Sequence, residues 1–372
     1  MSDRLVWARV MRPRIPLVYL DLNHFIELAR TVAGAKNVPA GYPALLDAAR
    51  SAAAENRALF PLSESHLWEI TAISDPKQRR SIAGVMEELS GFNYLLGRPS
   101  LAQLEIEAGI EDIFDETSPL PPLPLVRPTF AWAFGRRGGM TIRNGEGKDA
   151  EGSARQRMGD EKYEAFIQHA NYTVERGMLD GPSDEEVTHL RAQTNYAPEV
   201  ARASHQSRLD YELDLSTRLQ KDPQWRRGRL RDVVSAREVI HEWLDAINRV
   251  NEDRVNEGRP PLALGDEANA RRVMASMPHS QVAISIKTRY HQNPAHRWTT
   301  NDITDIDAMS VAYAYCDAVF TDKAVRSALA DSRELRTIDT YLPRTPPELA
   351  DWLAQLQPVA TPYLLVPHPP KT

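Results

Sequence analysis

Two short apolar segments, one near each end of the chain, run directly into an aspartate. Ile15 to Leu20 is followed by Asp21, and Ala318 to Thr321 is followed by Asp322. Each segment has the length and composition of a short buried strand. In open α/β folds, ligands bind in the crevice at the carboxyl ends of the strands. The pattern therefore predicts a parallel sheet whose ligand site uses carboxylates from both ends of the chain.

A third carboxylate follows another strand-like segment. Leu59 to Leu62 is apolar, and Ser63 is suited to cap the helix that contains Glu69. Glu69 lies among apolar residues, and we interpret it as an inward-pointing ligand rather than a solvated side chain. Glu64 is the alternative, although in the first helical turn it suits the helix dipole better. His66 lies on nearly the same face as Glu69 and is either a partner of the site or a structural histidine.

Three aspartates crowd the start of a later helical pattern. Asp302 and Asp305 share a face at a spacing of three residues, whereas Asp307 points elsewhere. Aspartate is enriched in first helical turns, so at least one of the three is expected to be a cap. We expect Asp305 to be the ligand and Asp302 to cap the helix or assist the site.

The alternation of strand and helix patterns is confined to the two ends of the chain. Residues 1–75 and 299–357 show it, the second with a further strand expected at 335–338. Residues 76–298 contain charged amphipathic helical patterns and no convincing strand, and 358–372 is a proline-rich tail. The predicted fold class is α/β, with a Rossmann-like parallel sheet flanked by helices and interrupted by a large all-α insertion.

The composition excludes several classes of protein. Of the 372 residues, 42% are hydrophobic and 26% are charged, and no apolar stretch approaches the roughly 18 residues of a membrane span. The arginine-rich N-terminus lacks the long apolar run of a signal peptide, so we do not expect export. A single cysteine, Cys316, excludes an internal disulfide, and a cytoplasmic location is the default expectation. The net charge of −6 argues mildly against a general nucleic-acid binder but is compatible with a local basic surface.

Taken together, the acidic motifs resemble those of the PIN-domain (PIN-like) nuclease superfamily. Val18-Tyr19-Leu20-Asp21-Leu22-Asn23 is similar to the hhhDxN pattern at the end of that family's first strand. Ser63 leading to Glu69 resembles its glutamate inside a helix, and Thr321-Asp322 resembles the T-D that closes a later strand. Asp305, with alanines at 308, 312 and 314, is similar to its D-x-x-h-x-x-A-x-A helix.

The resemblance covers about residues 15–75 and 299–357, and a compact family member has a short helical link where this chain has residues 76–298. It implies a small parallel sheet whose carboxyl-terminal edge holds Mg²⁺ or Mn²⁺ for RNA hydrolysis. The residues that it assigns to metal binding and catalysis are Asp21, Glu69, Asp305 and Asp322. Those that we expect to assist them are Asn23, Asp302, Asp307 and Thr321.

Two basic segments are candidates for contacts with phosphates. One is Trp225 to Arg231, for which we slightly favour a solvated helix face. The other lies just before the third acidic motif and has few acids beside it. From this second segment we expect Lys287, Arg289 and Arg297 to contact the substrate.

The sequence thus predicts a Mg²⁺- or Mn²⁺-dependent endoribonuclease acting on structured or single-stranded RNA, with a toxin-like or defence role suggested by analogy alone. The alternative of another class is a PIN-like module that binds nucleic acid, or regulates, without cleaving. A haloacid-dehalogenase-type phosphatase is disfavoured because Asn23 stands where that mechanism needs a second aspartate. Which RNA is cleaved, whether the chain forms a homo-oligomer, and whether an inhibitory partner controls it stay open.

Overall fold

The two apolar segments that end in aspartate are neighbouring parallel strands in the computed structural model of the chain. Strand β2 (Val18–Leu20) pairs with β6 (Ala318–Phe320), and every residue of both strands is buried. The N–H of Asp21 donates to the Phe320 carbonyl at 3.0 Å, so the pairing continues into the first acid. The predicted junction between the two ends of the chain is therefore present.

Parallel pairing extends beyond β2 and β6 only through single bridges. Leu17 pairs with Leu59 on one side, and Ala318 pairs with Tyr341 on the other. Leu62 pairs with Tyr94 of β3 (Asn93–Leu95), which is antiparallel to β5 (Val126–Pro128). The described residues therefore form a mixed α/β fold with a small sheet of few strands, and they do not show a large parallel sheet.

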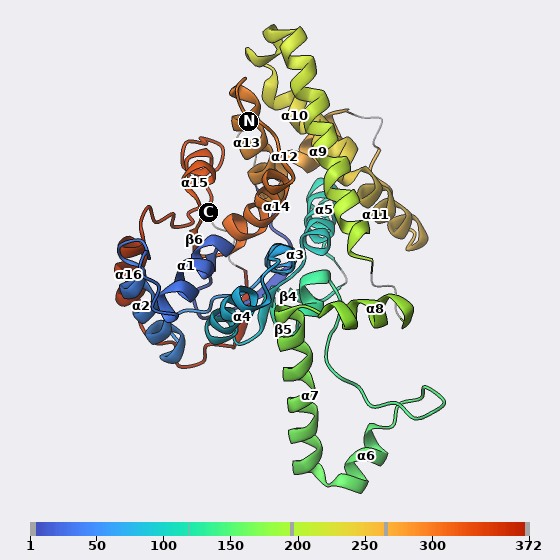
Figure 1. Ribbon diagram of the computed structural model, residues 1–372. Helices are drawn as coiled ribbons and strands as arrows, with labels where there is room; N and C mark the ends of the chain where they lie inside the picture. Colours follow the sequence, from blue (N-terminus) through green and yellow to red (C-terminus); the bar gives the residue numbers. More distant parts are fainter. Residues whose placement is uncertain (1–4, 119, 194–196, 264–266, 369–372) are drawn as a thin grey trace.

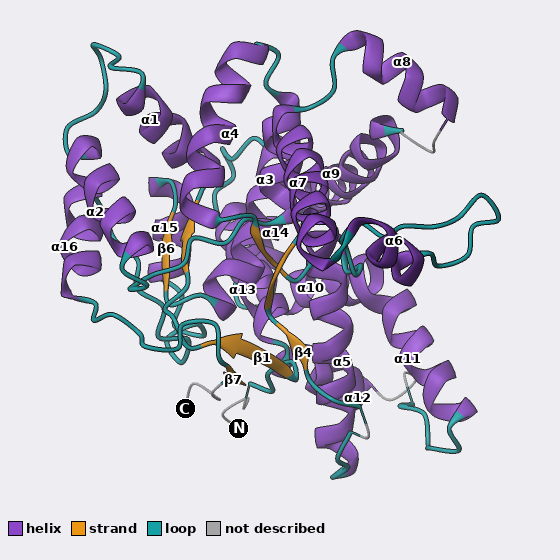
Figure 2. Ribbon diagram, turned by 90° about the horizontal axis from the view of Figure 1, so that it is seen from below, coloured by secondary structure: helices purple, strands orange, loops and turns teal. Residues whose placement is uncertain are grey.

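A separate small sheet joins the two ends of the chain away from the first. Its central strand β1 (Val10–Pro13) is parallel to β4 (Leu123–Pro124) and antiparallel to β7 (Leu365–Pro367). Figure 2 shows both termini beside this sheet. Part of the proline-rich tail is therefore a paired strand.

The structure describes residues 5–118, 120–193, 197–263 and 267–368, and helices predominate (Figure 1). The first group is α1 (Leu22–Val32), α2 (Tyr42–Ala54), α3 (Glu64–Ala72), α4 (Pro76–Ser90) and α5 (Arg98–Phe114). The middle group is η1 (Phe130–Phe134), α6 (Glu151–Met158), α7 (Asp160–Asp180), α8 (Asp184–Gln193), α9 (Pro198–Lys221), η2 (Pro223–Arg226), α10 (Leu230–Glu238), η3 (Val239–Trp243), α11 (Leu244–Asn256), α12 (Glu267–Ser276) and α13 (Pro278–Gln292). The last group is α14 (Thr300–Tyr315), α15 (Lys323–Ala330) and α16 (Pro346–Gln355). None of the described helices is long and apolar enough to cross a bilayer.

Two expectations about strands are wrong. Residues 76–298 are not all-α, because β3, β4 and β5 lie within them. These strands have two or three residues each, too few to show an alternating pattern in sequence. Residues 335–338 form turns, and the parallel bridge falls at Tyr341 instead. The buried Leu335 and Ile338 are spaced three residues apart and pack as turn residues against the core.

Alternating side chains of the central strands pack into two different hydrophobic cores. Leu17, Tyr19 and Val319 belong to the core that includes α13 and α14 residues, whereas Leu20 and Phe320 belong to the core with α1, α2 and α16 residues. Successive strand residues point to opposite faces, which explains the division. A third core is formed by α5, α9 to α13 and the turns between them.

A buried network of ion pairs connects the middle helices to α14. Its members are Arg98, Arg208, Lys287, Glu212, Glu238, Glu242 and Asp307. Lys287 Nζ lies 2.7 Å from Glu238 of α10, and Arg208 of α9 lies 2.5 Å from Asp307 of α14. Because α14 also carries Asp305, the packing of the middle helices determines the position of one predicted site residue.

Replacing Lys287 by Met should lower the free energy of unfolding by about 3–5 kcal/mol, because it leaves buried carboxylates without their cation. Urea denaturation followed by circular dichroism would measure the change. Arg289→Met is the control: its side chain is 54% exposed, and we expect a change within about 0.5 kcal/mol. Equal, small effects of both variants would show that the network does not depend on Lys287.

Candidate functional site

Asp21 is held at the end of β2 through both carboxylate oxygens. It is the N-cap of α1, and its Oδ1 accepts from the Leu22 N–H at 2.8 Å. The hydroxyl of Thr321, the residue that follows β6, donates to Oδ2 at 3.1 Å. Asp21 is 7% exposed. The carboxylate is therefore oriented by groups from both central strands.

His66 fixes the position of α3, and with it Glu69, against the end of β2. Its Nδ1 accepts from the Ser63 N–H at 3.0 Å, and its Nε2 lies 2.7 Å from the Leu20 carbonyl. Burial lowers the pKa of His66 to about 4, so the ring is neutral and donates through Nε2. Of the two roles considered for His66, the structural one is observed, and it links α3 to the residue before Asp21.

Asp305 is presented by α14, whose first turn is fixed by Asp302. Oδ2 of Asp302 accepts from the Thr299 N–H at 2.6 Å and from the Thr299 hydroxyl at 2.8 Å. Thr299 in turn caps the helix, so the two residues form a capping box. Asp302 is thus engaged in the helix cap, which leaves Asp305, one turn further, to face the end of β2.

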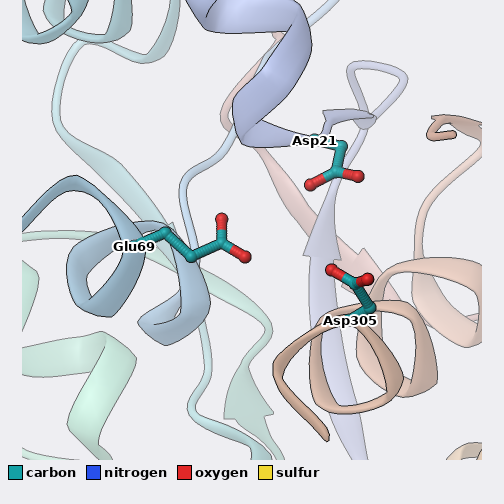
Figure 3. A group of neighbouring side chains, drawn as sticks. All are labelled: Asp21, Glu69 and Asp305. Atoms are coloured by element: carbon teal, nitrogen blue, oxygen red, sulfur yellow. The ribbon is translucent and has the colours of Figure 1, made fainter. Parts of the chain in front are cut away.

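The side chains of Asp21, Glu69 and Asp305 point toward one another (Figure 3). Each offers a carboxylate oxygen, and the three oxygens lie within 4.8 Å of one another. Within the part of the chain that the structure describes, no basic side chain forms an ion pair with any of them, and the carboxylates of Glu69 and Asp305 accept no hydrogen bond. The cluster therefore has no protein cation to balance the charge that its carboxyl groups carry when they are ionised.

Burial raises the pKa of all three carboxyl groups, and neighbouring carboxylates add to the rise. The pKa of Asp21 rises to about 6, mainly through burial and partly through the charge of Asp322. Burial and the charges of Asp21 and Asp305 raise the pKa of Glu69 to about 9. Burial and the neighbouring aspartates raise the pKa of Asp305 to about 8. Without a bound cation, the cluster therefore retains protons at neutral pH.

Asp322 lies beside the cluster without belonging to it. It is the N-cap of α15, where Oδ1 accepts from the N–H groups of Ala324 at 2.6 Å and Val325 at 2.9 Å. Its charge nevertheless raises the pKa of Asp21 and Asp305. The structure thus brings three of the four predicted ligands together and places the fourth at the edge. Asn23 is exposed in the first turn of α1.

Two candidates lie in the buried charge network instead of the site. Asp307, expected to assist the cluster, pairs with Arg208 and Arg98 because two residues along a helix turn the side chain to another face. Lys287, expected to contact the substrate, is 3% exposed and surrounded by glutamates. Both expectations are corrected. Arg289 and Arg297 are exposed, and their contact with substrate stays a prediction.

The structure also separates Glu64 from Glu69. Glu64 accepts from the Trp68 indole N–H at 3.2 Å and lines a cavity of about 30 Å³ beside Arg98 and Asp307. It therefore faces the buried charge network, whereas Glu69 faces Asp21. The sequence alone could not show this, because the neighbours of each glutamate come from distant helices.

Three further contacts that support the site could not be predicted from the sequence. The hydroxyls of Tyr19 and Ser63 lie 3.1 Å apart, and the ring of His24 stacks on Phe320 at a centroid distance of 3.7 Å. Tyr42 lies 2.7 Å from His24 Nδ1. Each contact depends on the pairing of β2 with β6 or on packing between helices, and no local sequence signal marks it.

The donor set is suited to a hard divalent cation. Three carboxylates and no sulfur or imidazole ligand favour Mg²⁺ or Mn²⁺ over softer metals. The cluster also lies at the carboxyl end of a parallel strand, where ligands bind in open α/β folds. Comparison of the chain with protein-family models, curated proteins and solved structures finds no match.

Without divalent cations, the free energy of unfolding should fall as the pH rises from about 7 to about 9. The folded-state pKa values of Asp305 and Glu69, about 8 and about 9, lie above their unfolded values of 3.8 and 4.5, so the folded state binds more protons in this range. The lowered pKa values of His24 and His66 act in the opposite direction only below about 6.5. Urea denaturation in EDTA across this range would test the trend, and a rise in stability would contradict it.

Asp305→Asn should raise the free energy of unfolding at pH 8 by about 1–2 kcal/mol in EDTA, because it removes one of the repelling charges at nearly constant shape. Thermal and urea denaturation would measure the gain. The matched control is Asp253→Asn on the exposed face of α11, for which we expect no change beyond about 0.5 kcal/mol. Destabilisation by Asp305→Asn alone would mean that Asp305 makes favourable contacts in the metal-free protein.

Proposed function

We propose that this chain is a metal-dependent ribonuclease in which Asp21, Glu69 and Asp305 bind Mg²⁺ or Mn²⁺. The observation that carries the proposal is the convergence of three carboxylates, one directly after β2 and the others on α3 and α14, with no protein cation among the described residues. The similarity of the acidic motifs to those of PIN-domain nucleases supports phosphodiester hydrolysis as the reaction. An endonucleolytic, toxin-like or defence role is the corresponding biological analogy.

The carboxylates of the cluster can accommodate a phosphodiester only when they also hold a cation. Three carboxylates alone would repel a phosphate, and they would also destabilise the charge that builds on the phosphoryl oxygens during hydrolysis. A bound Mg²⁺ or Mn²⁺ would supply neutralisation of that charge and a more acidic water as the nucleophile. The bound ion would thus replace electrostatic repulsion of the substrate phosphate by attraction.

The protein residues have separable roles in this proposal. Asp21 is oriented through both oxygens by Leu22 and Thr321, so it defines the position of the site relative to the strands. Glu69 and Asp305 hold protons at neutral pH and lose them when a positive charge arrives, because that charge offsets their mutual repulsion.

Asp322 is suited to a supporting role at the edge of the cluster. Its Oδ1 takes both bonds of the α15 cap, while Oδ2 accepts no hydrogen bond from the described residues. We expect Oδ2 to orient water or to add negative charge near the cation. Glu69 and Asp305 are half-buried rather than fully buried, so the cluster is open to solvent and to a substrate on their side.

End-labelled tRNA and single-stranded RNA, incubated with Mg²⁺ or Mn²⁺, would test the proposal. We expect the wild-type chain to cleave at least one of them in a metal-dependent reaction. Asp21→Asn should reduce the rate by about a hundredfold or more, since even a residue that only orients a metal ligand contributes about 10- to 100-fold. Asp253→Asn on α11 should cleave like the wild type.

Melting temperatures distinguish the reasons for a negative result. Mn²⁺ should raise the melting temperature of the wild type but not of Asp21→Asn, because the ion binds only the folded site. If the wild type neither cleaves RNA nor gains stability with Mn²⁺, the metal site is rejected and a non-catalytic binding module takes its place. Stabilisation without cleavage would confirm the ion site and reject these RNAs as substrates.

A further inference from the structure

A groove of about 350 Å³ lies between α10, α13 and the segment after α15. Figure 1 shows α13 between α10 and α15, and α13 contacts both of these helices. Four arginines line the groove: Arg226, Arg231, Arg289 and Arg333. The first two come from one of the basic segments seen in the sequence and Arg289 comes from the other. The fold thus joins two basic segments in one concave surface, which their positions in sequence did not indicate.

Two of these arginines donate to neutral groups, and one of the two, Arg231, also lies close enough to Glu334 for its charge to lower the pKa of that carboxyl. Arg226 donates to two backbone carbonyls, at 2.9 and 3.2 Å. Arg231 donates to Ser285 at 3.0 Å and to Gln281 at 2.6 Å. The neutral acceptors of Arg226 orient its guanidinium without cancelling its charge, and its remaining donors can bind an anion. Among the described residues, no carboxylate forms an ion pair with Arg226.

The floor of the groove contains a hydroxyl with no partner. Thr288 lines the groove and is 8% exposed, and its Oγ1 has no hydrogen-bond partner among the described residues. A buried hydroxyl without a partner costs roughly 1–3 kcal/mol, so an acceptor from a ligand would be favourable there. The oxygens of a phosphate accept hydrogen bonds and carry the charge that the arginines attract.

The acidic residues of the groove compensate only part of its charge. Asp331 pairs with Arg289 at 3.2 Å, but both side chains are more than half exposed, which makes the pair weak. Glu334 accepts from the Ser332 hydroxyl at 2.9 Å. Four arginines against two acids leave the groove positive in a chain whose net charge is −6.

Helix α15 connects this groove to the acidic cluster. It begins after Asp322, beside the cluster, and ends at Ala330, next to the groove residues Asp331 and Ser332. Eight helical residues span about 12 Å. A nucleic-acid strand covers this length with a few nucleotides, at about 3.4 Å per nucleotide when stacked. Trp225, next to Arg226, is 42% exposed and offers a ring on which a base can stack.

We infer that this groove binds backbone phosphates of a single-stranded RNA whose scissile bond lies at the acidic cluster. The inference rests on the proposed ribonuclease function and adds to it the path of the substrate. The four arginines contact phosphate oxygens, the Thr288 hydroxyl donates to one of them, and the strand runs along α15 toward Asp21, Glu69 and Asp305.

Fluorescence anisotropy with a labelled single-stranded RNA, in EDTA so that no cleavage occurs, tests the inference on the full chain. The double variant Arg289→Ala/Arg333→Ala should bind about tenfold more weakly than the wild type. The slope of log K against log salt should become shallower by about 1.4, since each lost phosphate contact on a single strand removes about 0.7.

Thr288→Val tests the groove without changing its charge. It removes the unpaired hydroxyl at nearly constant volume, so it should weaken RNA binding by about threefold while the melting temperature does not fall. Binding by this variant equal to that of the wild type would remove Thr288 from the inferred site.

The matched control is the double variant Arg157→Ala/Arg249→Ala, which makes the same charge change on the exposed faces of α6 and α11, helices that contribute no residue to the lining of the groove. It should bind RNA like the wild type. An equal loss in both double variants would indicate a general charge effect and overturn the inference. Saturable binding of inorganic phosphate that depends on Arg289 and Arg333, with unchanged RNA binding, would overturn it in favour of a small anion.

Failure of the groove and failure of the proposed function give different results. If RNA binding depends on the groove but no RNA is cleaved with Mg²⁺ or Mn²⁺, the strand-binding surface stands and the ribonuclease activity does not. If the chain cleaves RNA and the Arg289/Arg333 double variant binds and cleaves like the wild type, the activity stands and the groove is rejected.

Discussion

The parallel pairing of β2 with β6 is the constraint on which the rest of the structure depends. It joins segments from the two ends of the chain, and hydrogen bonds from Asp21 N–H to Phe320 and from Thr321 to Asp21 continue it beyond the strands. Both strands are fully buried, so their two faces must each be covered by helices, and the two cores on either side follow from this. The acidic cluster lies where this pairing ends.

The structure contains two opposite arrangements of charged side chains, one paired and one unpaired. In the network of Lys287, Arg208 and their carboxylate partners, buried charges are paired and tie the middle helices to α14. A few residues away on α14, Asp305 faces two other carboxylates with no cation from the described residues. Buried, unpaired charge of one sign is unfavourable for folding, and it is typical of sites where a ligand supplies the missing charge. The contrast between neighbouring faces of one helix supports the proposed metal site.

Sequence patterns predicted the strands and helices that carry the site residues better than they predicted which distant residues lie beside them. Apolar runs before Asp21 and Asp322, the cap at Ser63 and the crowded start of α14 are local signals, and the elements that they predict are present. The strands between residues 76 and 298 have only two or three residues each, so no sequence pattern marks them. The turn at 335–338 resembles a strand in sequence because it contains apolar residues, and these are buried in the structure. Lys287 was misinterpreted because its partners on α9, α10 and η3 are distant in sequence.

The sequence by itself determined where carboxylates fall relative to strand ends and helix starts, because capping and apolar periodicity depend on residues within a turn or two. It also determined that the chain has basic segments within a net charge of −6. Only the tertiary structure decided that Asp21, Glu69 and Asp305 meet while Asp307 turns away, and that Arg226, Arg231, Arg289 and Arg333 share one groove. The reason is physical: which side chains meet depends on helix rotation and packing between distant segments, and no local pattern specifies these.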